Sequence, residues 1–391
     1  MLNEFLENKM SEIKNAGLLR RLRLISSNPG AHIIIDGKEY INFSSNNYLD
    51  LAGNREINEE AARAVQKYGA GSVSSRLVGG TFRVHEELET ALADFKNKPA
   101  ALVFPSGYQA NVGVISALVS KNDNACIIMD KLNHASLWDG AKLSGARIFV
   151  YEHCDMSSFE SVLKRARGYN FKLAVTESVF SMDGDLTPLK DFAQLCVKYG
   201  AVSMVDEAHS AGVFGKEGRG LAWALGVEDK IDIIIGTLSK AFAAQGGFAC
   251  SSKKLIDFLI NKSRAFIYTT ALSPAICGTA LKSLEIVKKS GDKRRHLSVM
   301  SERLKNELNE AGFNTSNSRS QIVPIITGSI ENTQKAAEFL YKNGIYAPAI
   351  KFPTVPEGSA RIRISLTAGH NFADIEKLKN LTQKLRLSKS V

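Results

Sequence analysis

Two polar residues follow one apolar run of the sequence and are the first candidates for chemistry. The run VSMV leads into Asp206, and His209 follows it. Ligands of open α/β sheets bind outside the carboxyl ends of the strands. A carboxylate there needs a cationic partner, because an unpaired buried charge is costly, and a protonated pyridine nitrogen would supply one. The alternatives are a helix N-cap for Asp206 and an ordinary buried imidazole for His209.

A second apolar run, IDIIIG, has the same layout and leads into Thr237, Ser239 and Lys240. Hydroxyl groups and backbone amides at such a strand end can hold a phosphate. A lysine that is removed from water has a lowered pKa and becomes a nucleophile. A solvent-exposed lysine is the usual alternative, but Lys240 follows the buried run too closely for exposure to be the obvious choice.

Three further segments add polar residues at predicted strand ends. VFPSGYQANVGV places Gly107 and Tyr108 between a strand and a helix, whose N-terminus attracts phosphate. LAVTESVFSMDGD ends in a polar loop in which Ser181 could hydrogen-bond a phenolic oxygen or cap the next helix. His134, in DKLNHASLWDG, could lie over a planar ring or be an ordinary loop histidine. Each signal is weak alone, and they gain weight together.

A mostly parallel sheet is needed to position these residues. Short β-rich runs alternate with amphipathic segments such as SFESVLKRARGY and DFAQLCVKYG, which is typical of a sheet covered by helices. The predicted strands are ALVFPS, ACIIMD, ARIFVYE, LAVTESVF, AVSMVDE, IDIIIGTLS and GFACSS. We therefore predict an α/β protein whose large domain covers residues 46–275.

The flanking segments have a different pattern. Residues 1–45 read as a helical arm with short strands, and residues 276–391 as a smaller α+β domain. In the latter domain, a single long helix over residues 273–312 is followed by strands at IVPIIT and ARIRISLT.

Composition limits the classes of function. The 391 residues are 44% hydrophobic and carry a net charge of +10, with basic and acidic residues interleaved rather than in blocks. This pattern argues against nucleic acid and suits a polyanionic small substrate. The five cysteines lack paired spacing, so we expect no metal site and a cytoplasmic protein. No apolar run is long enough to span a membrane.

Together, these motifs resemble the α-oxoamine synthases, a family of fold-type I pyridoxal 5'-phosphate (PLP) enzymes. GTLSKAFAAQGG, VDEAHSAGVFG, NHASLWDGA and TESVFSMDGD carry the resemblance, which extends over residues 42–367. It implies a large domain with a seven-stranded, mostly parallel sheet and a smaller C-terminal domain. It also implies PLP as the cofactor and a homodimer with shared sites.

The resemblance implies roles for individual residues. Lys240 would hold PLP as a Schiff base, Asp206 would pair with the pyridine nitrogen and His134 would stack on the ring. Ser181 and His209 would contact the phenolic oxygen. The phosphate would be bound by Gly107, Tyr108, Thr237 and Ser239, and by Thr270 of a neighbouring subunit.

Substrate contacts follow from the same resemblance. Arg363 would bind an amino-acid carboxylate with help from Asn46. Further substrate contacts would come from Arg20, His134, Lys351 and Thr354. Lys351 departs from the family, where arginine is usual. A compact ammonium group therefore replaces the planar guanidinium of arginine.

The closer match of RAFIYTTALSPA, SQIVPI and FPTVPEGSARIRISLTAGH implies particular substrates. They are L-alanine and a pimeloyl thioester of CoA or a carrier protein, which condense with loss of CO2 in biotin biosynthesis. Glycine-using sister enzymes, 2-amino-3-ketobutyrate CoA ligase and 5-aminolevulinate synthase, share every cofactor residue and are the first alternative. A non-catalytic partner subunit of the same fold is a different class, but it would be expected to lose Lys240, Asp206 or His134.

Overall fold

The computed structural model describes residues 1–387, which form two compact units. The larger unit contains Asn47–Ser181 and Leu186–Arg295, and the smaller one contains Met1–Asn46, Met182–Asp185 and the chain from His296 onward. The domain boundaries predicted after residues 45 and 275 stay a prediction. The compact units differ from them mainly at helix α11 (Pro274–Lys289), which belongs to the larger unit and packs on its helices α2 (Arg55–Tyr68) and α3 (Arg83–Phe95).

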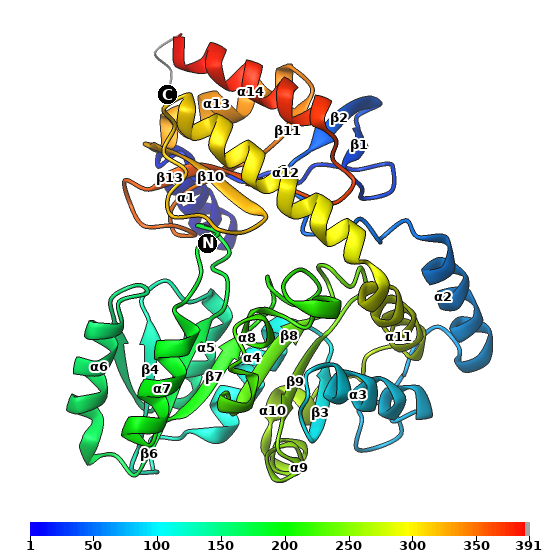
Figure 1. Ribbon diagram of the computed structural model, residues 1–391, viewed down its shortest axis with the longest axis vertical. Coiled ribbons are helices and arrows are strands. Elements are labelled where there is room, and N and C mark those ends of the chain that lie inside the picture. Colours follow the sequence, from blue (N-terminus) through cyan, green and yellow to red (C-terminus); the bar gives the residue numbers. More distant parts are fainter. Residues whose placement is uncertain (388–391) are drawn as a thin grey trace. The chain divides into compact units, whose positions relative to one another are not determined.

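A seven-stranded sheet forms the centre of the larger unit (Figure 1), with the strand order β3-β9-β8-β7-β6-β4-β5. β9 runs antiparallel to both of its neighbours, and all other pairs are parallel. The strands are β3 (Ala100–Phe104), β4 (Ala125–Asp130), β5 (Arg147–Tyr151), β6 (Phe171–Glu177), β7 (Val202–Asp206), β8 (Ile233–Thr237) and β9 (Gly247–Ser251). All seven predicted strands are therefore confirmed.

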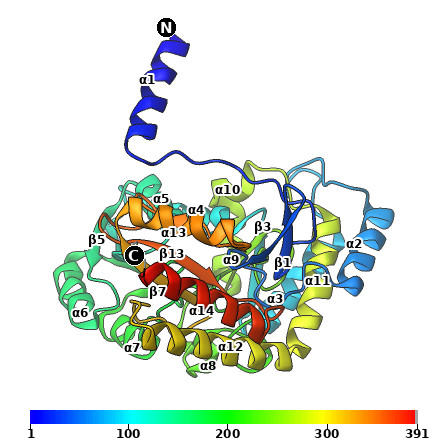
Figure 2. The same ribbon diagram turned by 90° about the horizontal axis from the view of Figure 1, so that it is seen from above.

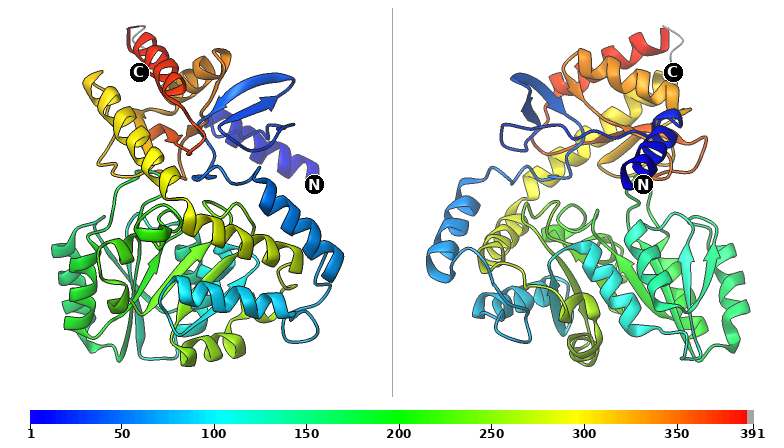
Figure 3. Two further views of the ribbon diagram at one scale, coloured as in Figure 1. Left: turned by 45° about the vertical axis from the view of Figure 1, so that its right-hand side comes forward. Right: turned by 180° about the vertical axis from the view of Figure 1, so that it is seen from behind.

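Helices cover both faces of this sheet (Figure 3), which explains why its central strands are apolar without alternation. Every residue of β4, β8 and β9 is buried. The remaining helices of the unit are α4 (Gly107–Leu118), α5 (Ala135–Ser144), α6 (Met156–Arg165), α7 (Leu189–Tyr199), α8 (Leu221–Ala224), α9 (Lys253–Lys262) and α10 (Arg264–Ile267). Within residues 1–387, no helix combines the length and apolar character needed to cross a bilayer.

The smaller unit contains two three-stranded sheets. One consists of β10 (Ile322–Gly328), β13 (Ala360–Ser365) and β12 (Ala349–Ile350), and the other of β1 (His32–Ile35), β2 (Lys38–Asn42) and β11 (Ile345–Tyr346). Its helices are α1 (Leu2–Asn15), α12 (Gly291–Glu310), α13 (Ile330–Lys342) and α14 (Phe372–Leu387). α1 has no buried residue and stands off from the strands of its own unit (Figure 2).

The single helix predicted over residues 273–312 was wrong, because the chain forms two helices there. α11 ends at Lys289 and α12 begins at Gly291. The Ser290 hydroxyl donates to the carbonyl of Ile286, and the Ser290 carbonyl accepts from Arg294 N. Ser290 therefore ends one helix and starts the next. Glycine after a serine weakens a helix interior enough to permit this break.

Candidate active site

The candidate site of the larger unit lies where neighbouring parallel strands end. Glu177 ends β6, Asp206 ends β7 and Thr237 ends β8. Glu177 and Asp206 are directly paired in register. The predicted residues of these segments therefore share one edge of the sheet, which is the edge where α/β proteins bind ligands.

Lys240 follows β8 and contacts His209, which follows β7. The Lys240 Nζ lies 2.9 Å from His209 Nε2, and the Tyr48 hydroxyl lies 2.6 Å from His209 Nδ1. His209 and Tyr48 are buried, whereas Lys240 is half-buried. The buried imidazole is thus fixed from both sides and holds the lysine amine in place.

Asp206 is buried and accepts hydrogen bonds from neutral donors. Asn111 Nδ2 lies 2.7 Å from its Oδ2, and the Ala208 amide lies 2.8 Å from its Oδ1. The same Asn111 amide lies 2.9 Å from the hydroxyl of Ser136. These neutral donors leave the negative charge of Asp206 available to a cationic ligand atom.

Asn111 was missed by the sequence analysis. The sequence spacing could have indicated it, because Asn111 lies four residues, or about one helical turn, after Gly107 in α4. Residues four apart share one face of a helix, so the face that begins at the predicted phosphate site also faces Asp206.

Gly107 and Thr237 form a narrow cradle. Gly107 begins α4 behind its N-cap Ser106, whose side chain accepts from Gln109 N. A methyl group on Gly107 would lie 3.2 Å from the Cβ of Thr237. The Thr237 hydroxyl is 2.7 Å from the Ser239 hydroxyl. Free amides, two hydroxyls and the helix dipole together make an anion site.

His134 is the N-cap of α5 and lies near the charged groups of the site. Its backbone N–H donates to Oε1 of Glu177 at 2.6 Å, and its Nδ1 lies 2.8 Å from the Ser136 hydroxyl. The surrounding protein desolvates the imidazole and lowers its pKa, an effect that Asp206 opposes and Lys240 reinforces. This direction favours the uncharged form of the imidazole.

Three other predicted cofactor residues, Tyr108, Ser181 and Thr270, differ in their contacts and exposure. The Tyr108 hydroxyl donates to Asp139 at 2.7 Å, a hydrogen bond that raises the pKa of the phenol. Ser181 is half-buried and ends the first segment of the larger unit. Thr270 is exposed. Their roles toward the cofactor stay predictions.

The predicted substrate residues belong mainly to the smaller unit. Arg363, on β13, donates to the Asn46 side chain at 3.1 Å. Arg20 donates to the Thr354 hydroxyl at 3.5 Å. Lys351 donates to the carbonyl of Gly17, and desolvation together with the charge of Arg20 lowers its pKa. His134 is the one predicted substrate residue in the larger unit.

The donor set fits PLP. At Gly107 the absence of a side chain lets the start of α4 approach Thr237 closely, which sets the α4 amides beside two hydroxyl groups, and buried Asp206 offers a charge to a ring nitrogen. Lys240 presents its amine beside His209, on the segment that follows β8. A seven-stranded α/β sheet with this lysine at a strand end defines a PLP-dependent enzyme of fold type I.

The chain belongs to the aminotransferase class I and II family, whose model matches residues 38–380. It is 43% identical to the 8-amino-7-oxononanoate synthase of Geotalea daltonii over 372 residues, which are 94% of each chain. It is 40% identical to the synthase of the same name from Thermoanaerobacter pseudethanolicus over 383 residues, which cover 98% of this chain and 96% of the relative.

Solved structures agree with the family. The chain superposes on a PLP-containing serine palmitoyltransferase from S. paucimobilis with a TM-score of 0.93 and 31% identity, over 100% of both chains. It superposes on 8-amino-7-oxononanoate synthase from Francisella tularensis with a TM-score of 0.79 and 29% identity, over 90% of this chain and 99% of the other. The predicted fold, cofactor and enzyme class are thereby confirmed.

Proposed function

We propose that this chain condenses L-alanine with a pimeloyl thioester and releases 8-amino-7-oxononanoate, CO2 and the thiol of CoA or of a carrier protein. This reaction is a step of biotin biosynthesis. The observation that carries the proposal is Lys240 Nζ beside His209 at the sheet edge that also holds Asp206. The identity to synthases of this name over nearly the whole chain supports the choice of substrates.

Several residues of the larger unit would hold the cofactor. When bound, PLP supplies an aldehyde that combines with amines and a ring that withdraws electrons from an amino acid's α-carbon. Asp206 would keep a proton on the ring nitrogen, and His134 would cover the ring and exclude water. Ser181 and His209 would hydrogen-bond the phenolic oxygen. The phosphate would be bound by Gly107, Tyr108, Thr237 and Ser239.

Lys240 would act as the base of the reaction. Its amine takes the α-proton of alanine, and His209 keeps that amine in position. The α-carbon then bonds to the thioester carbonyl carbon, and the thiol leaves with a proton. The alanine carboxylate departs as CO2, and a proton returns to the α-carbon.

Residues of the smaller unit would recognise the anionic parts of the substrates. Arg363 has the planar fork that binds a carboxylate through two hydrogen bonds, and Asn46 orients it. Arg20 and Thr354 are already in contact, and Lys351 adds a positive charge to the same segment. These contacts suit alanine's carboxylate and an anionic acyl chain.

A homodimer would complete the phosphate site through Thr270. The segment around this residue is tied to residues 70–74, since Ala271 N donates to the Ser74 carbonyl at 2.9 Å. Nearby apolar side chains are open to solvent, with exposures of 94% for Val73 and 86% for Val78. Covering them with a second copy would bury apolar surface and bring Thr270 to the partner. Light scattering after gel filtration tests this arrangement.

A cytoplasmic location fits the state of the cysteines. All five are free thiols, and burial raises the pKa of Cys196 and Cys277, which keeps these two protonated. Unpaired thiols are typical of a reducing compartment.

The experiment that tests the reaction is a thiol-release assay on PLP-loaded protein. Pimeloyl-CoA, succinyl-CoA and acetyl-CoA are each paired with L-alanine or with glycine, and a pimeloyl carrier protein is assayed beside pimeloyl-CoA. Release with alanine and a pimeloyl thioester is expected. A preference for glycine with a short acyl-CoA would contradict the proposal and indicate a sister enzyme. Substrate choice follows differences in contact energy, so both amino acids are needed.

A further inference from the structure

The loop that presents His134, residues 131–134, is held by hydrogen bonds from two of its backbone amides and from one side chain. The Leu132 amide donates to Oδ1 of Asp130 at 2.8 Å, and the Asn133 side chain donates to the Val175 carbonyl at 3.0 Å. The His134 amide donates to Glu177 at 2.6 Å. A loop fixed this closely can keep the side chain it carries in one place.

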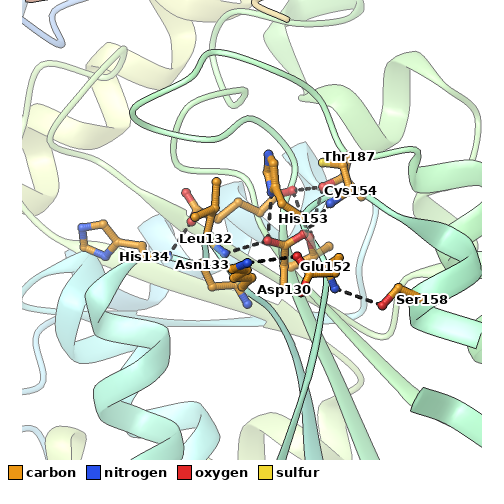
Figure 4. A network of polar contacts seen from close by, with 12 residues as sticks. Asp130, Leu132, Asn133, His134, Glu152, His153, Cys154, Ser158 and Thr187 are labelled. Atoms are coloured by element: carbon orange, nitrogen blue, oxygen red, sulfur yellow. Dashed lines mark hydrogen bonds and ion pairs between the residues drawn. The ribbon is translucent and has the colours of Figure 1, made fainter. Parts of the chain in front are cut away.

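Asp130 joins this loop to the loop that follows β5. Its side chain is fully buried and accepts from Leu132 N, from His153 Nδ1 at 2.9 Å and from Cys154 N at 2.9 Å. Figure 4 shows these groups gathered around the carboxylate, while the ring of His134 points away from them.

The same group also has the composition of a metal site. Potential ligand atoms of Asp130, His153 and Cys154 lie within 4.8 Å of one another. However, three hydrogen bonds from two loops already compensate the carboxylate. Two of those donors are backbone amides, which cannot bind a cation. The cluster is therefore explained as a backbone anchor.

Glu177 is the second anchor and lies in an unfavourable place for a carboxyl group. It is 3% exposed and pairs in register with Asp206 on the neighbouring strand. Burial raises its pKa well above the usual range, and the charge of Asp206 adds to this effect. Buried polar groups are retained where they satisfy a partner, and this one accepts the His134 amide.

We propose that Glu177 and Asp130 are positioning residues for His134, which hold its loop so that the imidazole is in place before the cofactor and substrate bind. The inference rests on the proposed function only in that His134 covers the cofactor ring. Glu177 fixes the amide of His134 itself, and Asp130 fixes the amide two residues earlier. The loop then needs no reordering when the ligands arrive.

The test compares single and double variants of the PLP-loaded protein. Glu177→Ala removes the acceptor and is expected to lower kcat about tenfold, with a weaker visible circular dichroism band of the cofactor. Glu177→Gln keeps an acceptor oxygen and is expected to restore most of both signals. In a His134→Ala background, Glu177→Ala is expected to change kcat by less than about twofold, because residues that act through one another are not additive.

Glu152→Ala is the matched control, since this carboxylate contacts the same loop at Lys131, 3.0 Å away, but from the exposed side. It is expected to leave both signals unchanged. If Glu177→Ala does not fold, Asp130→Asn is the second variant. It should also lower kcat and weaken the visible band, and in a His134→Ala background its effect on kcat should again be small.

Three outcomes separate this inference from the proposed function. In the first, the wild-type protein shows a normal visible band, but the effects of Glu177→Ala and His134→Ala on kcat multiply in the double variant. This outcome would overturn the positioning role and leave the proposed function standing. Equal losses in Glu177→Ala and Glu177→Gln would do the same, since the amide oxygen should replace the carboxylate. A wild-type protein that binds PLP without any visible band would contradict the proposed function itself.

Discussion

Nζ of Lys240 lies 2.9 Å from Nε2 of His209, so the two side chains predicted from separate strand ends are in direct contact. The other ring nitrogen of His209 contacts the Tyr48 hydroxyl at 2.6 Å. The imidazole is therefore held between a buried phenol and the amine that is proposed to move the proton. Proton transfer depends on such geometry first and on the pKa second.

Replacing Lys240 by alanine should abolish turnover and the visible absorbance of the lysine-linked cofactor together. The reason is that one amine serves both as the attachment point and as the base. Thiol release and the absorption spectrum measure the two effects. Lys254→Ala, at an exposed lysine, is the control and should behave as wild type. Normal turnover by Lys240→Ala would refute the mechanism.

Tyr48→Phe should lower kcat about threefold to tenfold with little change in KM for alanine. The variant keeps the buried ring but removes the hydroxyl that fixes His209, and a lost hydrogen bond at such a site is worth about 1 kcal/mol. Steady-state kinetics at several pH values would measure this. An unchanged kcat would show that the Tyr48 hydroxyl is not needed to orient the imidazole.

Asn111→Ala should weaken both the fold and the reaction. It removes a 2.7 Å hydrogen bond to buried Asp206, which costs about 1–3 kcal/mol of unfolding free energy. Asp206 would then hold the ring nitrogen less precisely, so kcat should also fall. Urea unfolding and thiol release measure the two effects. If stability falls but kcat does not, Asn111 serves the fold only.

Gly107→Ala should reduce the affinity for PLP by at least about tenfold. The added methyl would lie 3.2 Å from Thr237 Cβ, inside the cradle proposed for the phosphate. Titration of the apoprotein with PLP, followed by absorbance, gives the affinity. Gly168→Ala is a matched control, because no atom lies within 4 Å of its added methyl. Equal affinities in both variants would move the phosphate site elsewhere.

His370 should make the smaller unit sensitive to acid. Burial lowers its pKa to about 4 despite the opposing charge of Asp374, and its ring stacks on Phe43 at 4.5 Å. The unfolded chain takes up a proton near pH 6.5, but the folded chain does not until near pH 4. The contribution of His370 to the free energy of unfolding is therefore complete above pH 6.5. It is lost as the pH falls toward 4, and the loss is on the order of 3 kcal/mol.

Unfolding by urea at pH 7 and pH 4.5 would measure this dependence. His370→Gln lacks the titrating group and should lose less stability between the two pH values than wild type does. Identical losses would assign the acid sensitivity to other groups.

The sheet and the lysine site could be predicted because their signals are local. Each central strand is one apolar run, and Asp206, Thr237 and Lys240 follow such runs directly. The two-residue strands β11 and β12 could not be found in this way, since they form only by pairing with β2 and β13. Pairing between distant segments leaves no periodic pattern in so short a strand.

The supporting residues of the site were harder to predict for the same reason. Tyr48 and Asn111 lie 161 and 95 positions from the side chains they contact. Glu177 was visible as a polar residue at a strand end, but its partner is a backbone amide, which no sequence pattern reports. Sequence thus indicates which groups react, while the fold determines which groups hold them.

The loop that carries Lys240 is closed at both ends by one hairpin. β8 and β9 pair antiparallel, with Thr237 opposite Gly247, so residues 238–246 must start and finish at fixed points. An inserted or deleted residue would have to be absorbed inside this loop or shift the pairing, which would turn every side chain of a strand to its other face. Engineers who wish to widen the acyl range should therefore leave the length of this loop unchanged and vary residues elsewhere.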